Sequence, residues 1–242
     1  MIPKKIHYCW FGGKEKPESV IQMINSWRRN LPNYEIIEWN EKNFDINGNL
    51  YTKEAYEEKK YAFVTDYVRL FAVYNYGGIY MDTDVEVLKN LDNFLVHGAF
   101  TGCENEKNCV TGLMGGIPGH KWYEDLLSNY QNRSFYKKDG SLDLTTNTKT
   151  ITEITTHLYG WKPNDVIQEL VQDLVIYPSD YFCAKSWDTG VILMTENTHA
   201  IHHFAGSWKS AKEKYISKFL SKTKKFIVSI IGENNFNKLR GK

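Results

Sequence analysis

Two aspartates, Asp82 and Asp84, lie two positions apart at the end of the apolar run 77–81. Residues i and i+2 of a strand face the same side, so the two carboxylates can point at one ligand. Two like charges held in this way favour a cation between them. The same Asp-Thr-Asp pattern is also typical of a solvated turn that links two strands, so the surrounding residues must decide between the two interpretations.

Two adjacent histidines, His202 and His203, end a short apolar stretch late in the chain. Because adjacent residues on a strand face opposite sides, only one of them can join the carboxylates at a metal. Neutral imidazole added to carboxylates shifts the preference from magnesium toward manganese. A divalent cation held by these groups keeps open positions, for which a phosphate-bearing substrate is a natural ligand. The alternative is a pair of ordinary strand-end histidines.

A third candidate pair is Asp66 and Arg69, three residues apart within the apolar stripe of a helix expected over 62–76. An i,i+3 ion pair is more often a surface contact that contributes little to stability. The position of this pair favours a functional role, because the helix leads through Gly77 and Gly78 directly into the strand that precedes Asp82 and Asp84.

The beginning of the chain supplies the elements that can hold these residues. The pattern predicts a strand over 5–11, a helix over 17–30 and a strand over 34–39, which is a β-α-β opening. Ligands of such sheets bind at the carboxyl ends of strands. Further expected elements are strands at 100–104, 110–114, 174–178 and 200–204, and helices at 120–130 and 149–158. We therefore expect an α/β fold with a mixed, mostly parallel sheet flanked by helices.

The composition fits one domain, because 242 residues with 42% hydrophobic side chains can bury a sizeable core. The net charge of +1 argues against a nucleic-acid binder. The four cysteines show no metal or disulfide spacing, which indicates reduced thiols in a cytosolic protein and no zinc site. No signal peptide or run of about 18 apolar residues is present, so we expect a cytoplasmic location, either free or peripheral on the inner face of the membrane.

Residues 209–242 differ from the rest of the chain, with ten Lys or Arg against two Glu. We expect basic amphipathic helices there, following a domain over 1–208. A cationic amphipathic helix can bind the surface of an anionic membrane, where each lysine contributes about 1 kcal/mol. The alternative, equally supported by the sequence, is a helix packed on the domain with its lysines in solvent.

Four spaced motifs resemble glycosyltransferase family 32, a group that contains bacterial capsular-polysaccharide transferases and yeast initiating mannosyltransferases and is related to the clostridial glucosylating toxins. The motifs are Ile2-Pro-Lys-Lys-Ile-His-Tyr-Cys-Trp10-Phe-Gly-Gly13, Ala62-x-x-Thr-Asp66-x-x-Arg69, Gly77-Gly-Ile-Tyr80-x-Asp82-x-Asp84 and His203-Phe-x-Gly206-Ser207-Trp208. The resemblance covers residues 2–208 in the same order. It implies a GT-A (Rossmann-like) fold, a nucleotide-sugar donor, Mn²⁺ or Mg²⁺, and retention of anomeric configuration.

The resemblance also implies roles for residues that bind the donor. Trp10 would stack on the base, which favours a uridine donor by similarity to the toxins. Asp66 and Arg69 would bind the sugar and ribose side as catalytic residues. Tyr80 belongs to the same donor-binding motif, and Asp82, the third expected catalytic residue, would contact ribose or sugar hydroxyls.

The metal and the diphosphate would be held by the remaining positions. Asp84 is the firmest expected metal ligand, Asp82 would share the metal with the donor, and His203 would complete the site. In a related family of galactosyl- and glucosyltransferases, the motif that begins with this histidine ends in Lys-Pro-Trp. This chain has Gly206-Ser207-Trp208 instead, so Ser207 and Trp208 would bind the diphosphate. The implied acceptor is a glycan or a lipid-linked oligosaccharide of a bacterial capsule or other surface polysaccharide.

The chemistry agrees with this assignment. Cleavage of the sugar–phosphate bond places negative charge on the leaving diphosphate, which a divalent cation stabilises. The sugar passes through an oxocarbenium-like state that Asp66 can favour, with or without a covalent intermediate. Two alternatives stay open. A phosphatase of the haloacid-dehalogenase type would use an aspartate nucleophile, although Glu86 does not fit that motif. A non-catalytic carbohydrate-binding or assembly protein could keep the same scaffold, although Asp84 and Arg69 are both present.

Overall fold

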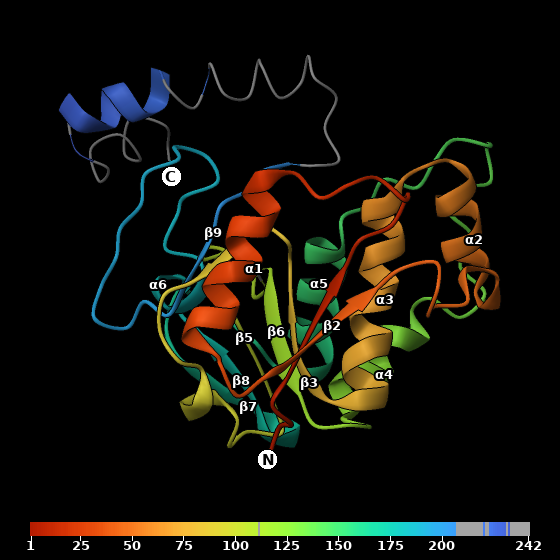
Figure 1. The fold of residues 1–242 in the computed structure, drawn as a ribbon, viewed down its shortest axis with the longest axis horizontal. Helices are drawn as coiled ribbons and strands as arrows, with labels where there is room; N and C mark the ends of the chain where they lie inside the picture. The colour runs from red at the N-terminus through yellow and green to blue at the C-terminus, as the bar shows by residue number, and fades with distance from the viewer. Residues whose placement is uncertain (111, 207–219, 221–222, 231, 233–242) are drawn as a thin grey trace.

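The computed structural model describes residues 1–110, 112–206, 220, 223–230 and 232. The strands are β1 (Lys5–Cys9), β2 (Glu35–Trp39), β3 (Gly78–Met81), β4 (Val85–Val87), β5 (Ala99–Gly102), β6 (Leu113–Gly116), β7 (Gln168–Leu170), β8 (Leu174–Tyr177) and β9 (Ala200–His202). The α-helices are α1 (Glu18–Asn30), α2 (Leu50–Glu57), α3 (Tyr61–Tyr76), α4 (Lys121–Ser128), α5 (Asn147–Tyr159) and α6 (Ser179–Phe182). Figure 1 shows these elements around a central sheet.

The central sheet has seven strands in the order β2-β1-β3-β6-β5-β8-β7, and β4 and β9 form a separate two-stranded sheet. The β1–β2, β1–β3 and β5–β8 pairs are parallel. The β3–β6, β5–β6 and β7–β8 pairs are antiparallel. The mixed α/β class is therefore confirmed. The strands β1, β2, β3, β5 and β8 run in one direction, as expected for a mostly parallel sheet, and β6 and β7 run against their neighbours.

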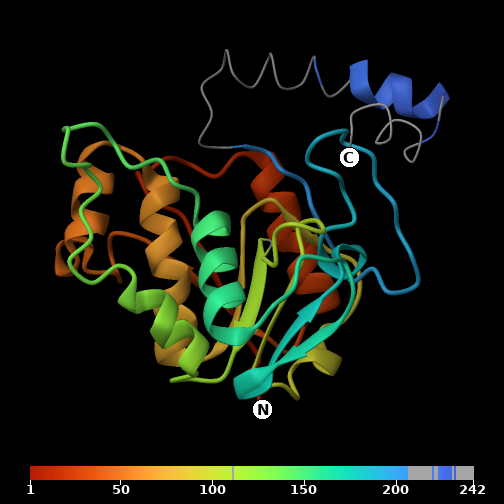
Figure 2. The same ribbon diagram turned by 180° about the vertical axis from the view of Figure 1, so that it is seen from behind.

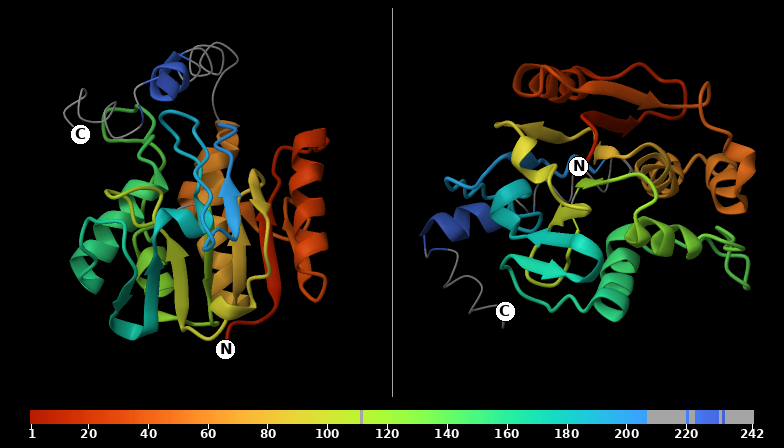
Figure 3. Two further views of the ribbon diagram at one scale, coloured as in Figure 1. Left: turned by 90° about the vertical axis from the view of Figure 1, so that its left-hand side faces the viewer. Right: turned by 90° about the horizontal axis from the view of Figure 1, so that it is seen from below.

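Two apolar cores lie on opposite faces of the sheet. Alternate residues of β3 divide between them, because Ile79 and Met81 pack in one core and Tyr80 in the other. The first core includes Trp27 of α1, together with residues of the small β4–β9 sheet. The second includes residues of α3, α4 and α5. Figures 2 and 3 show α1 on one side of the sheet and α5 on the other.

The junction between α3 and β3 needs two glycines. Gly77 ends α3 with a φ of +61°, and a Cβ there would lie 2.7 Å from Cδ of Pro118. Gly78 has a φ of +109°, and its Cβ would lie 2.7 Å from the carbonyl oxygen of Lys5. Only glycine adopts these dihedral angles without strain while allowing such close approach. The junction fixes the direction in which β3 leaves the helix and hence the position of Asp82.

The expected elements correspond to observed ones with shifted ends, and β4 corresponds to the second strand of the turn interpretation of Asp82 and Asp84. The helices α2 and α6 and the strand β7 were not predicted. Residues 220 and 223–230 are helical, while most of the remaining predicted basic helices lies outside the described residues. Within the described part of the chain, no helix combines the length and apolar character needed to cross a bilayer.

Candidate active site

Asp82 and Asp84 lie in a turn between β3 and β4, which is the second of the two interpretations that their spacing left open, and not on a strand. The turn is closed by a hydrogen bond of 3.0 Å from the backbone N–H of Val85 to the carbonyl oxygen of Asp82. The backbone N–H of Asp82 also donates to the carbonyl oxygen of Gly112 in a bond of 2.7 Å. Both aspartate side chains are only about one-fifth exposed, at 23% and 21%. The turn is therefore ordered by neighbouring backbone and is not a freely solvated connection.

The histidine beside the two aspartates is His202. Its Nε2 lies 3.3 Å from Oδ1 of Asp84 and 3.9 Å from Oδ2 of Asp82. The prediction of His203 as the metal ligand is therefore corrected. His202 pairs with Val85 in the antiparallel β4–β9 ladder, which brings it beside the turn. His203 faces the other way, with its Nε2 2.8 Å from Oε2 of Glu86.

Asp84 is held as a carboxylate. Burial alone would raise the pKa of Asp84, but the charge and hydrogen bond of His202, together with the N–H of Ala205, hold that pKa at about 2. The Ala205 N–H donates to Oδ2 of Asp84 in a bond of 2.7 Å. Burial opposes a charge on His202, but the neighbouring Asp84 carboxylate raises the pKa of His202 well above its ordinary value. A positive charge at this position therefore stabilises the site, whether it is a proton or a metal ion.

Arg69 joins the predicted helix pair to the turn. One of its terminal nitrogens, Nη2, lies 3.2 Å from Oδ1 of Asp66 and 3.1 Å from Oδ1 of Asp82. Tyr80 donates its hydroxyl to the same Asp82 oxygen in a bond of 2.7 Å, and the guanidinium lies 4.6 Å from the centroid of the Tyr80 ring. The structure therefore brings Asp66, Arg69, Tyr80 and Asp82 together in one buried network that reaches the metal-binding candidates.

The buried half of this network has unusual electrostatics. Burial raises the pKa of Asp66 to about 7, with Arg69 acting against this rise and Asp82 adding to it. The Nε atom of Arg69 is buried and has no hydrogen-bond partner among the described residues. An orphaned donor of this kind is rare in native proteins and is typical of a site that receives a ligand or an ordered water.

The remaining predicted donor residues are separate from this network or lie outside the described residues. Trp10 follows β1 at its carboxyl end, half-buried, with its indole N–H donating to the carbonyl oxygen of Lys14 in a bond of 2.6 Å. The ammonium of Lys16 lies 6.0 Å from the Trp10 ring centroid. Ser207 and Trp208 lie outside the described residues, so their proposed contact with the diphosphate stays a prediction.

Two further charged residues near the site were missed by the sequence analysis. Glu104 follows β5, and burial raises its pKa. The charge of His202 lowers the pKa of Glu104, and the charge of Asp82 raises it further. Lys185 follows α6, and its Nζ donates to the carbonyl oxygen of His203 in a bond of 2.8 Å. Neither belongs to a motif, and both come from loops that only the fold brings near the turn.

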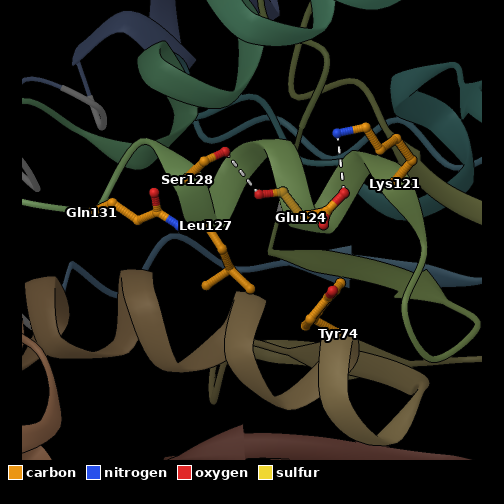
Figure 4. Close-up of a pocket in the computed structure, with 6 residues that line it drawn as sticks. All are labelled: Tyr74, Lys121, Glu124, Leu127, Ser128 and Gln131. Carbon is orange, nitrogen blue, oxygen red and sulfur yellow. Dashed lines mark hydrogen bonds and ion pairs between the residues drawn. The ribbon is translucent and has the colours of Figure 1, made fainter.

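Two hollows are lined in part by residues of α3. One of about 440 Å³ lies between α3 and α4, and Figure 4 shows its lining by Tyr74, Lys121, Glu124, Leu127, Ser128 and Gln131. Another of about 270 Å³ has an aromatic lining that includes Trp39, Tyr67 and Tyr76. Neither contains any predicted site residue, and the chemistry of their linings does not match the acidic network.

The turn and β9 together fit a divalent cation. One atom each from Asp82, Asp84 and His202 can be chosen so that the three lie within 4.8 Å of one another. Two carboxylate oxygens and one imidazole nitrogen form a donor set that suits Mn²⁺ or Mg²⁺, with remaining coordination positions open to a substrate. The fit supports the predicted metal, with His202 in place of His203.

Comparison with known proteins agrees with the motifs. Residues 17–101 match the family model described as "Glycosyltransferase sugar-binding region containing DXD motif". The resemblance predicted from the motifs is confirmed for this region, which includes the Asp66–Arg69 helix and the Asp82–Asp84 turn. Trp10 and the segment around His202 lie outside the matched residues.

Two curated relatives from Schizosaccharomyces pombe are similar over longer stretches. Inositol phosphoceramide mannosyltransferase 2 is 25% identical over 211 residues, which cover 80% of this chain and 61% of the relative. Inositol phosphoceramide mannosyltransferase 3 is 29% identical over 138 residues, which cover 55% of this chain and 38% of the relative. The chain thus spans less than two thirds of the length of either relative.

Among solved structures, the chain is similar to one titled "PaToxG Glycosyltransferase", with 15% identity and a TM-score of 0.47. The alignment covers 64% of this chain and 68% of that chain. A score at this level does not establish a shared fold, so the GT-A assignment stays a prediction.

Proposed function

We propose that this chain is a retaining, metal-dependent glycosyltransferase of the GT-A type, because residues 17–101 match the family model of a glycosyltransferase sugar-binding region containing a DXD motif. It moves a hexose or N-acetylhexosamine from a nucleotide sugar, with a UDP-sugar favoured, to a glycan or lipid-linked acceptor. The observation that carries the proposal is the Asp82–Asp84–His202 cluster, joined through Arg69 to the buried Asp66. The family match favours this function over the phosphatase alternative.

The metal site supports cleavage of a sugar–diphosphate bond. A divalent cation held by Asp82, Asp84 and His202 supplies Lewis acidity to the leaving diphosphate. Asp84 suits the firmest ligand position, because its low pKa keeps it ionised over the physiological range. Asp82 divides its two oxygens, with Oδ1 toward Arg69 and Tyr80 and Oδ2 toward His202. It can therefore orient the donor and ligate the metal at the same time.

The Asp66–Arg69 pair supports binding of the donor sugar. Arg69 is fixed by two carboxylates and one aromatic ring, so its free Nε–H points in a set direction. A fixed donor aimed at a hydroxyl or ring oxygen orients the sugar without loss of side-chain freedom on binding. Asp66 places a carboxyl group beside it, which can favour positive charge that develops on the sugar ring.

Retention and the acceptor rest on resemblance. Attack by the acceptor from the face that the diphosphate leaves retains configuration and needs no protein nucleophile. The two yeast relatives are named as mannosyltransferases of a lipid, inositol phosphoceramide. These names support hexose transfer to a lipid-linked acceptor, and a role in bacterial capsule or another surface polysaccharide remains the predicted setting.

The test is turnover of a panel of UDP- and GDP-sugars with Mn²⁺, Mg²⁺ or a chelator, measured as release of the nucleoside diphosphate with water as the acceptor. We expect turnover of at least one donor, its loss with the chelator, and a decrease of at least about a hundredfold in Asp84→Ala. Asp139→Ala, which removes an exposed carboxylate in a distant turn, serves as the matched control. Full activity of Asp84→Ala would contradict the proposal, as would failure to use any donor.

A further inference from the structure

Most of the charged side chains that the structure describes around the candidate metal ligands Asp82, Asp84 and His202 are negative. Asp66, Asp82, Asp84 and Glu104 all lie in or near the network, while the guanidinium of Arg69 is already shared between two of them. A divalent cation offsets only part of this charge. A substrate that brings a diphosphate would therefore meet strong repulsion unless a further cation lies close by.

Lys185 is such a cation. Its ammonium is half-buried and donates to the carbonyl oxygen of His203, whose own backbone N–H donates to the carbonyl oxygen of Asp84. No ion pair joins Lys185 to a carboxylate among the described residues. The ammonium has three N–H donors, and the His203 carbonyl accepts from only one of them. A half-buried ammonium that keeps N–H donors available beside candidate metal ligands is a typical anion-binding arrangement.

The backbone around Lys185 holds its side chain in place. Lys185 bridges Ile192 across a short hairpin. The N–H of Ser186 donates to the carbonyl oxygen of Val191 in a bond of 2.9 Å, and that of Leu193 donates to Ala184 in a bond of 2.8 Å. The hairpin therefore holds the backbone of Lys185 in place while its ammonium faces the segment that follows β9. This order reduces the entropy that Lys185 loses when it binds an anion.

We propose that Lys185 binds the diphosphate of the nucleotide-sugar donor and stabilises its negative charge as the sugar leaves. This inference rests on the proposed function, because it names a residue for the leaving group of that reaction. It assigns to the 184–193 hairpin a diphosphate contact that the sequence analysis assigned only to the uncharged Ser207 and Trp208. Lys185 would contact substrate directly and acts together with the cation held at the Asp82–Asp84 turn.

The test is equilibrium binding of UDP, GDP and UMP by calorimetry, with and without Mn²⁺. We expect Lys185→Met, which keeps the length but removes the charge, to bind the nucleoside diphosphate about tenfold more weakly, as expected for a lost charge-assisted hydrogen bond. Lys185→Arg should stay within about threefold of the wild type, and UMP affinity should change much less. The tenfold difference should decrease at high salt. Lys121→Ala, an exposed lysine on α4, is the control for loss of one positive charge.

A structural role for Lys185 predicts a different result. If the lysine only supports the His203 backbone, Lys185→Met will lose Mn²⁺ affinity measured without nucleotide, and UMP and UDP affinities will fall together. Either outcome overturns the proposal, and so does unchanged UDP and GDP affinity. If the wild type binds no nucleoside diphosphate at all, the proposed function fails with it, which separates the two failures.

Discussion

His202 faces the aspartates because of one register position, the pairing of His202 with Val85 across β4 and β9. A shift of one residue would exchange the two histidines, since adjacent side chains on a strand face opposite sides. We therefore expect His202→Ala to weaken Mn²⁺ binding by at least about tenfold, because it removes one of three ligands. Calorimetric titration of Mn²⁺ into the protein without nucleotide checks this.

His203→Ala is the matched control for that prediction. Its side chain contacts Glu86 and not the cluster, so Mn²⁺ affinity should remain within about threefold of the wild type. The opposite ranking of the two variants would restore His203 as the ligand and contradict the structure.

Arg69 offers a second test at the scale of a single residue. Lysine keeps the positive charge but cannot reach Asp66 and Asp82 with one planar group while it also stacks on Tyr80. Arg69→Lys should lower kcat/KM for the donor by at least about tenfold, a loss of about 1.4 kcal/mol of transition-state stabilisation. Arg28→Lys, at an exposed position on α1, should leave turnover unchanged. Unaltered kinetics of Arg69→Lys would remove Arg69 from the proposed mechanism.

The sequence predicted the part of the site that lies within one short stretch. Asp66, Arg69, Asp82 and Asp84 belong to one helix–turn–strand unit, so spacing was sufficient to suggest that they meet. Glu104 and Lys185 meet them only through long-range packing of loops, for which local spacing carries no signal. The choice between two adjacent histidines depended on a strand register that the sequence pattern left open.

At the scale of elements, the connection of α3 to β3 controls where the aspartates lie. We expect Gly77→Ala to destabilise the fold by about 2–3 kcal/mol, because the new Cβ would contact Pro118 and Pro3 in addition to the positive φ. Gly119→Ala has a similar φ of +70° with no atom near its Cβ, so it should cost only about 1 kcal/mol. Urea unfolding of both variants measures the difference, and equal losses would contradict the steric argument.

His7, a residue of β1, is a neutral imidazole that joins β2 to the connection between α3 and β3. Its Nδ1 accepts from the indole of Trp39 at 3.1 Å, and its Nε2 donates to the carbonyl oxygen of Gly77 at 2.8 Å. Burial lowers the pKa of His7 below the ordinary 6.5. The unfolded chain therefore takes up the proton first, so the contribution of His7 to stability is full above pH 6.5 and decreases as the pH falls below it.

The corresponding prediction concerns the pH dependence of the free energy of unfolding. His7→Gln should lower stability at pH 7.5 and should lose less additional stability than the wild type between pH 7 and pH 5. His157→Gln, at an exposed position on α5, should keep the wild-type dependence. Parallel curves for His7→Gln and the wild type would contradict the neutral state of His7.

The elements that the sequence predicted best have a clear period or a clear end. α1 and α3 each carry a regular apolar stripe, and α3 ends at a glycine pair. The missed elements are short or polar, such as the three-residue β7 and the four-residue α6. α2 was missed because it follows Asn49 in an Asn-rich stretch that resembles a loop, although the Asn49 side chain caps the helix by accepting from the N–H of Thr52.

At the scale of the whole molecule, apolar side chains are exposed on two neighbouring segments. Trp187, Leu193 and Met194 of the stretch 184–194 are 57%, 59% and 63% exposed. Phe226 and Ile230, one turn apart on the helix 223–230, are each 67% exposed. Lys224 of that helix forms an ion pair with Asp188 of the hairpin at 2.5 Å. The apolar surface and the lysines of the helix 223–230 therefore occur together, which is the combination that binds an anionic bilayer.

We expect the full chain to float with vesicles that contain anionic lipid and to remain unbound with neutral vesicles, because both apolar burial and lysine charge are needed. Binding should weaken as salt rises, since about 1 kcal/mol per lysine near the surface is screened. Phe226→Glu should reduce flotation by disturbing the apolar part alone, and a chain without residues 209–242 should lose it. Leu144→Glu, an exposed apolar position on another loop, is the control. Equal flotation with and without residues 209–242 would assign these lysines to solvent and leave the acceptor to reach the site from solution.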